Sequence, residues 1–126
     1  MKREHLEEFL ERGISLGFRK ATDDPRYLGW IRLSKRKPDE RHLAMLAPGE
    51  EPRFVAEQEI LRSKPYFVLV IELSREVIAS DRYETMDDYR VFEQHYFADP
   101  DEVEKIIGQY ECALEDIRWL HEIEAP

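Results

Sequence analysis

The stretch Tyr66-Phe67-Val68-Leu69-Val70-Ile71-Glu72-Leu73 is apolar at every position except Glu72. A short continuous apolar run of this kind is typical of a sheet strand that is covered on both faces. Its longest uninterrupted part, Tyr66–Ile71, has six residues, far fewer than the roughly 20 that a membrane-spanning helix needs. We therefore place Tyr66–Leu73 in the middle of the core as the central strand.

Three other segments are predicted to form strands with it. Tyr27–Leu33 is rich in aromatic and branched residues, and Arg41–Leu46 alternates polar and apolar residues after a charged loop. Ser74-Arg75-Glu76 can turn the chain back, so that Val77–Ser80 forms a hairpin with the central strand. The expected fold class is α+β, with a mostly antiparallel sheet of about four strands.

A helix is expected at the start of the chain. From Arg3 to about Phe18 the apolar residues follow helical spacing. An end near Gly13 fits equally well, and the residues that follow would then alternate as a short strand. Farther along, Phe54–Leu61 matches neither period and is open to a short helix or an irregular strand.

Two helices are predicted to follow the sheet and pack on it. Thr85 with acids in the next turn predicts a helix from Met86, with apolar residues at helical spacing up to Tyr96. The second helix has Asp99 as its cap and Pro100 at its first position. Its apolar stripe consists of Val103, Ile106, Ile107, Tyr110, Ala113, Leu114, Ile117 and Leu120.

The last predicted helix has a second apolar face. Cys112, Trp119 and Ile123 point away from the main stripe, because Trp119 lies two residues, about 200° of helix rotation, from Ile117. Such a helix is either deeply buried or shared with another chain. The second face, with the neighbouring acids Glu115 and Asp116, is therefore the predicted interaction site, and a homodimer is one way to cover it.

Charge is distributed unevenly along the 126 residues. The net charge is −9, but residues 1–64 carry 14 Lys/Arg against 12 Asp/Glu, whereas residues 65–126 carry 5 against 16. The second half thus has a net charge of −11. An acidic surface repels nucleic-acid backbones and attracts a basic protein partner.

The length and the cysteine count indicate one cytoplasmic domain. A chain of 126 residues has the usual size of a single domain. Its one cysteine, Cys112, cannot form an internal disulfide, so nothing calls for an oxidising compartment. The charged start of the chain, Met1–His5, lacks the apolar core of a signal peptide, and we expect neither export nor membrane insertion.

The sequence predicts no catalytic residue, metal site or cofactor. The four histidines are scattered, and no phosphate-binding glycine loop or nucleophile motif is present. A non-enzymatic role is favoured. One alternative is a small hydrolase or metal enzyme built on His95, which has Glu93 two residues before it.

A second alternative is a nucleic-acid-associated regulator. Residues 26–42 carry a local net charge of +4 beside aromatic residues, a pattern also seen in nucleic-acid binding. The residues that would bind are Trp30, Arg32, Lys35, Arg36 and Lys37. The simpler interpretation is a solvated loop whose charge balances the acidic half, so the leading hypothesis remains an adaptor, chaperone or inhibitor that binds a basic protein.

Overall fold

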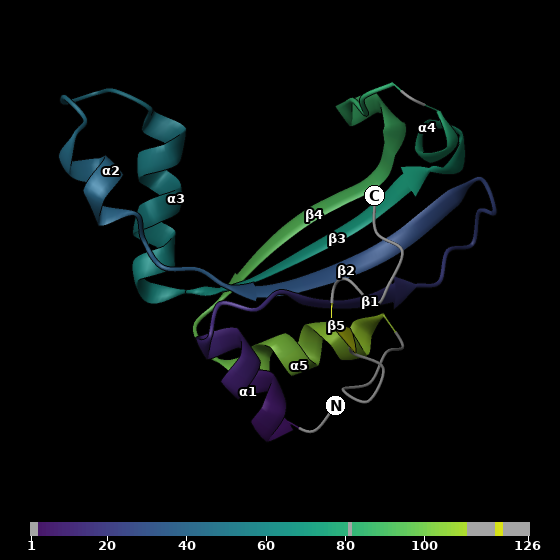
Figure 1. Ribbon diagram of the computed structural model, residues 1–126, viewed down its shortest axis with the longest axis horizontal. Helices are drawn as coiled ribbons and strands as arrows, with labels where there is room; N and C mark the ends of the chain where they lie inside the picture. Colours follow the sequence, from purple (N-terminus) through teal and green to yellow (C-terminus); the bar gives the residue numbers. More distant parts are fainter. Residues whose placement is uncertain (1–2, 81, 111–117, 120–126) are drawn as a thin grey trace.

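The computed structural model of the protein describes residues 3–80, 82–110 and 118–119 (Figure 1). Its centre is an antiparallel sheet with the strand order β4-β3-β2-β1-β5. The long strands are β1 (Leu16–Lys20), β2 (Tyr27–Lys35), β3 (Tyr66–Ser74) and β4 (Tyr89–Phe97). The fifth, β5, is the two-residue strand Arg118–Trp119 beside β1. The predicted α+β class and the sheet around Tyr66–Leu73 are confirmed.

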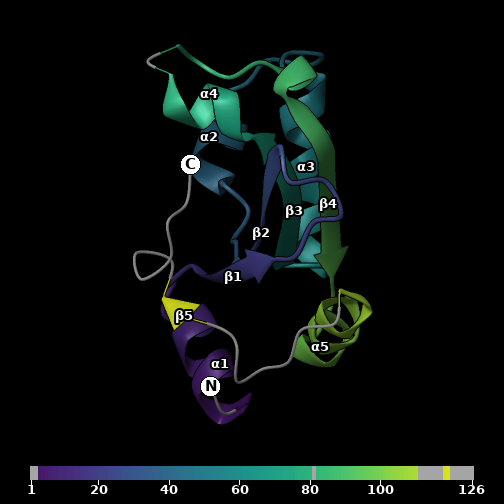
Figure 2. The ribbon, with the colours of Figure 1, turned by 90° about the vertical axis from the view of Figure 1, so that its right-hand side faces the viewer.

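Helices lie on both sides of this sheet. Figures 1 and 2 show α1 and α5 on one face, whereas α2 and α3 stand at one end of the other face and α4 at its opposite end. Their bounds are α1 Arg3–Glu11, α2 Glu40–Ala44, α3 Pro52–Ser63, α4 Arg75–Ala79 and α5 Pro100–Gln109. No helix among the described residues is both long enough and apolar enough to cross a membrane.

The main core fills the space between the sheet and the pair α1 and α5. Alternate residues of the central strands, such as Ile31, Val68 and Val70, meet Leu10 of α1 and Ile107 of α5 in one buried cluster. The opposite face of the sheet carries a smaller cluster of Trp30, Ile71 and Leu73. Because β3 contributes to both clusters, it has the apolar character on both faces that its sequence shows.

The first helix ends early, as the alternative interpretation allowed. It stops at Glu11, and Gly13 takes the left-handed conformation with a φ of 77°, which only glycine adopts without strain. The chain then enters β1, where Leu16 and Phe18 point into the main core. The longer helix to Phe18 is therefore wrong.

Two predicted strands are short helices instead. Arg41–Leu46 falls largely within α2, because the Asp39 side chain accepts a hydrogen bond from the His42 backbone N–H at 3.0 Å and caps a helix there. Of the predicted hairpin strand Val77–Ser80, the first three residues lie in α4 and Ser80 is its C-cap. The ambiguous segment Phe54–Leu61 is helical, within α3.

The predicted helix from Met86 to Tyr96 is wrong. Only one 3-10 turn forms, η1 (Met86–Asp88), and the Thr85 backbone N–H donates to Asp88 Oδ2 at 2.8 Å beside it. The chain then becomes strand β4 and pairs with β3. Tertiary pairing with a buried strand has outweighed a helical spacing of apolar residues, as it does when the residues involved are aromatic or β-branched.

The helix predicted from Asp99 is confirmed at its start. Asp99 caps α5, its side chain accepting from the Asp101 backbone N–H at 2.8 Å. The helix ends at Gln109. Of the residues assigned to its second apolar face, Trp119 lies in strand β5 opposite Leu16, so the two-faced helix is wrong at that position. Cys112, Glu115, Asp116 and Ile123 lie outside the described residues.

Replacing glycine by alanine should have opposite effects on stability at Gly29 of β2 and at Gly108 of α5. A Cβ on Gly29 would lie 2.7 Å from the Lys20 carbonyl oxygen, whereas a Cβ on Gly108 would meet nothing within 4 Å. Gly29→Ala should therefore lower the free energy of unfolding by about 1–3 kcal/mol, and Gly108→Ala should raise it by about 0.5–1 kcal/mol. Urea denaturation of both variants measures this. Equal effects would contradict the close approach of β1 and β2 at Gly29.

Candidate functional site

Strand β4 forms one edge of the sheet. It pairs with β3 on one side, and no strand among the described residues pairs with its other side. A bulge shifts the register between Glu72 and Leu73 of β3, opposite Arg90. From Val91 to Phe97 the pairing is regular. An exposed edge of this length presents a row of backbone N–H and C=O groups that another strand can pair with.

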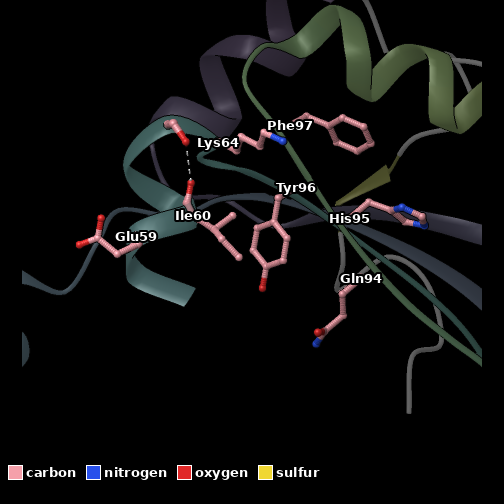
Figure 3. A pocket seen from close by; sticks show the side chains of 8 residues that line it. Glu59, Ile60, Lys64, Gln94, His95, Tyr96 and Phe97 are labelled. Atoms are coloured by element: carbon pink, nitrogen blue, oxygen red, sulfur yellow. Dashed lines mark hydrogen bonds between the residues drawn. The ribbon is translucent and has the colours of Figure 1, made fainter. Parts of the chain in front are cut away.

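A groove runs between this edge and α3. It encloses about 580 Å³ and is lined by Glu59, Ile60, Ser63, Lys64, Gln94, His95, Tyr96 and Phe97. Figure 3 shows Tyr96 and Ile60 directed toward one another across it, with Gln94 on the same side of the strand. Ile60 is 40% exposed and Phe92, farther along β4, is 39% exposed. The groove is open, and apolar atoms form most of its exposed surface although five of its eight lining residues are polar or charged.

His95 belongs to the opposite face of the strand. Its side chain points away from Ile60 and Tyr96 in Figure 3, and its Nε2 lies 3.2 Å from Glu93 Oε2. The Tyr110 hydroxyl donates to the same Glu93 oxygen at 2.8 Å. This bond, followed by the contact with His95, lowers the pKa of Glu93. Burial and the Glu93 carboxylate raise the pKa of Tyr110 to about 12.

His95 and Glu93 form a close pair on β4. A carboxylate does lie within hydrogen-bond reach of the imidazole, as an enzyme built on His95 would need. His95 is also among the residues that line the groove, although its imidazole points away from Ile60 and Tyr96 in Figure 3. The described residues contain no group of three His, Cys, Asp or Glu side chains placed to hold a metal ion.

Acidic residues flank both ends of β4. Glu84, Asp87 and Asp88 precede the strand, Asp99, Asp101 and Glu102 follow it, and these two flanks, residues 84–88 and 98–102, contain no Lys or Arg. Asp88 is held by Arg82, whose Nη2 lies 2.8 Å from Asp88 Oδ1. Asp87 is exposed. A cationic segment aligned with the edge would therefore meet negative charge at each end.

A buried ion cluster fixes β4 to the rest of the sheet. The Glu72 side chain is 3% exposed, and Lys20 of β1 forms an ion pair with it. Arg90 Nε of β4 lies 3.4 Å from Glu72 Oε1, and Arg90 also pairs with Asp23. These contacts join strands β1, β3 and β4 on the face that carries α1 and α5. Their role is structural, since the cluster lies away from the groove.

The basic segment predicted to bind nucleic acid is largely engaged within the fold. Lys35 forms an ion pair with Glu11, and Arg36 Nη1 lies 3.4 Å from Glu57 Oε1 with its guanidinium 4.0 Å from the Phe67 ring centre. Trp30 is only 1% exposed. Arg32 is half-buried on β2, and Lys37 is exposed. The structure therefore does not bring these residues together as one exposed basic and aromatic surface.

The groove was missed in the sequence because its strand was predicted as a helix. Tyr89–Phe97 contains five aromatic or β-branched residues, Tyr89, Val91, Phe92, Tyr96 and Phe97. That content, which favours strands, was the available signal. The position of α3 beside β4 is a tertiary fact with no local signal.

Comparisons with protein families, with curated proteins and with solved structures gave no match to this chain.

Proposed function

We propose that this protein is a non-enzymatic protein-interaction module that binds a basic partner along the β4 edge. The observation that carries the proposal is the regular outer edge of Val91–Phe97 beside an open apolar groove. An extended segment of a partner could add to β4 as a further strand, with its main chain supplying affinity. Its alternate side chains would then enter the groove.

Charge supports a basic partner rather than an acidic one. Both flanks of β4 are acidic, and residues 65–126 carry a net charge of −11. Lysine or arginine residues at the ends of an added strand would meet Asp87 on one side and Asp101 on the other. Complementary charge of this kind steers association and sets specificity. The proposed role is that of an adaptor, chaperone or inhibitor.

A pair of synthetic peptides tests the proposal. One peptide alternates valine with lysine, and the other alternates valine with glutamate. We expect the lysine peptide to bind, as measured by fluorescence anisotropy, and its affinity to fall as salt is added. The glutamate peptide should not bind. Failure of the lysine peptide to bind, or equal binding of both peptides, would contradict the proposal.

Two isoleucines supply a matched pair of variants for this test. Ile60 on α3 lines the groove and is 40% exposed, whereas Ile78 on α4 is 38% exposed and is not among the groove residues. Ile60→Ser should weaken binding of the lysine peptide about tenfold, because a buried apolar contact in an interface contributes about 1–2 kcal/mol. Ile78→Ser should leave it unchanged. Equal effects of the two variants would remove the groove from the binding site.

A further inference from the structure

The regularly paired part of β4 is symmetric in length about one residue, Gln94. The bulge at Arg90 interrupts the strand near its start, so the regular stretch runs from Val91 to Phe97 and its middle residue is Gln94. We infer that a second copy of this chain pairs with this edge, antiparallel, with Gln94 of each copy on the two-fold axis. The pairing would join the two sheets into one.

The side chains of β4 are complementary to themselves in this register. Phe92 lies opposite Tyr96 of the second copy, and Val91 lies opposite Phe97 of the second copy. Glu93 lies opposite His95 of the second copy, and Gln94 meets its own copy. Aromatic pairs, apolar pairs and pairs of opposite charge are the combinations that stabilise neighbouring antiparallel strands, each by about 0.2–1 kcal/mol.

The neighbouring registers lack this complementarity. A shift of the axis to Glu93 places that carboxylate directly opposite its own copy, which is destabilising. A shift to His95 places two imidazoles opposite one another and leaves only residues 93–97 of the strand paired. The axis through Gln94 is the one that uses the whole regular stretch and brings no like charges together within the strand.

The same pairing covers exposed apolar surface. Phe92, which is 39% exposed, would lie beside Tyr96 of the second copy, and Tyr96 lines the groove with Ile60. The axis is perpendicular to the sheet, so α1 and α5 of both copies remain on one face.

Beyond the strand ends, however, the two copies repel one another. The axis brings Glu84–Asp88 of one copy toward Asp99–Glu102 of the other, and both segments are acidic. Salt screens this repulsion between exposed charges. Self-association should therefore tighten as salt is added, whereas binding of a basic partner should weaken.

Self-pairing would also regulate access of a partner to the β4 edge. The second copy and the added strand of a partner would occupy the same edge, so dimerisation would hold the module closed until the partner displaces the second copy. This regulatory step rests on the proposed function. The pairing itself rests on β4 alone.

Charge variants at Gln94 test the pairing, because this exposed residue meets its own copy. Light scattering after size exclusion, at about 0.1 M and about 1 M salt, measures the association. We expect a wild-type dimer that tightens at high salt. Gln94→Lys and Gln94→Glu should each weaken it about tenfold, since each places like charges on the axis. An equal mixture of the two variants should recover a mixed dimer.

The control is Gln109→Lys, which makes the same change at an exposed glutamine on α5. It should dimerise like the wild type. A monomeric wild-type protein would overturn the inference, as would a dimer that both Gln94 variants leave unchanged. If the lysine peptide binds but the protein forms no dimer, the proposed function is supported and the self-pairing is refuted. A dimer that binds neither peptide would support the pairing and remove the regulatory step together with the proposed function.

Discussion

Lys20→Met should lower the free energy of unfolding by about 3 kcal/mol, because it leaves a buried carboxylate without its principal partner. Glu72 is 2% exposed and forms its ion pair with Lys20. Arg90 Nε approaches to 3.4 Å but makes no hydrogen bond with Glu72 Oε1, which accepts none from the described residues. Urea denaturation measures the loss.

A double-mutant cycle separates the ion pair from the packing of its side chains. The double variant Lys20→Met/Glu72→Met removes both charges, so it should be less destabilised than the two single variants added together, by about 1–3 kcal/mol. Arg12→Met is the control, since Arg12, directly after α1, forms an exposed pair with Glu8 at 4.0 Å. It should change stability by less than about 1 kcal/mol. Additive effects of the two buried changes would mean that Glu72 and Lys20 do not interact.

Trp30→Ala should lower the free energy of unfolding by about 3–5 kcal/mol. Trp30 is 1% exposed, packs with Ile71 and Leu73, and has the Arg19 guanidinium 5.2 Å from its ring centre. Removing the indole leaves a cavity on this face of the sheet. Met45→Ala is the control, because Met45 is 76% exposed, and its effect should be within about 0.5 kcal/mol.

The same variant tests the nucleic-acid alternative. A tryptophan that stacks on bases must be accessible, and its loss would weaken binding without affecting the fold. The burial of Trp30 predicts the reverse, a loss of stability seen in both chemical and thermal unfolding. A Trp30→Ala protein with wild-type stability and reduced binding to a single-stranded oligonucleotide would contradict the placement of Trp30 in the core.

Sequence patterns predict an element correctly where its hydrophobic pattern or capping residues match the contacts that it makes in the fold. Tyr66–Leu73 is apolar on both faces and lies between two clusters, and the Asp99-Pro100 start of α5 carries its own cap. Both predictions are confirmed. The clearest failure is Tyr89–Phe97, where Thr85 and two acids start a helical turn that pairing with β3 then ends. Local capping signals could not reveal that this segment would pair with the edge of the buried strand β3.

The candidate site depended on that failed element. An interaction role was predicted, but it was assigned to a helix face containing Trp119, which pairs with Leu16 in a strand instead. The groove needs β4 as an edge strand and α3 beside it, and these segments are separated by the whole of β3. Charge was more informative, because six of the sixteen acids of residues 65–126 lie in the two segments that flank β4.

Hydrogen exchange of the β4 backbone amides tests the central claim, that the outer edge of this strand pairs with another chain. Exchange over Tyr89–Phe97 would be followed at low and high protein concentration and with the lysine peptide added, using the β2 amides as an internal reference. We predict that alternate amides of Val91–Phe97 become protected at high concentration or on addition of the peptide, while those of β2 stay unchanged. Exchange in β4 that responds to neither would contradict the role of this edge.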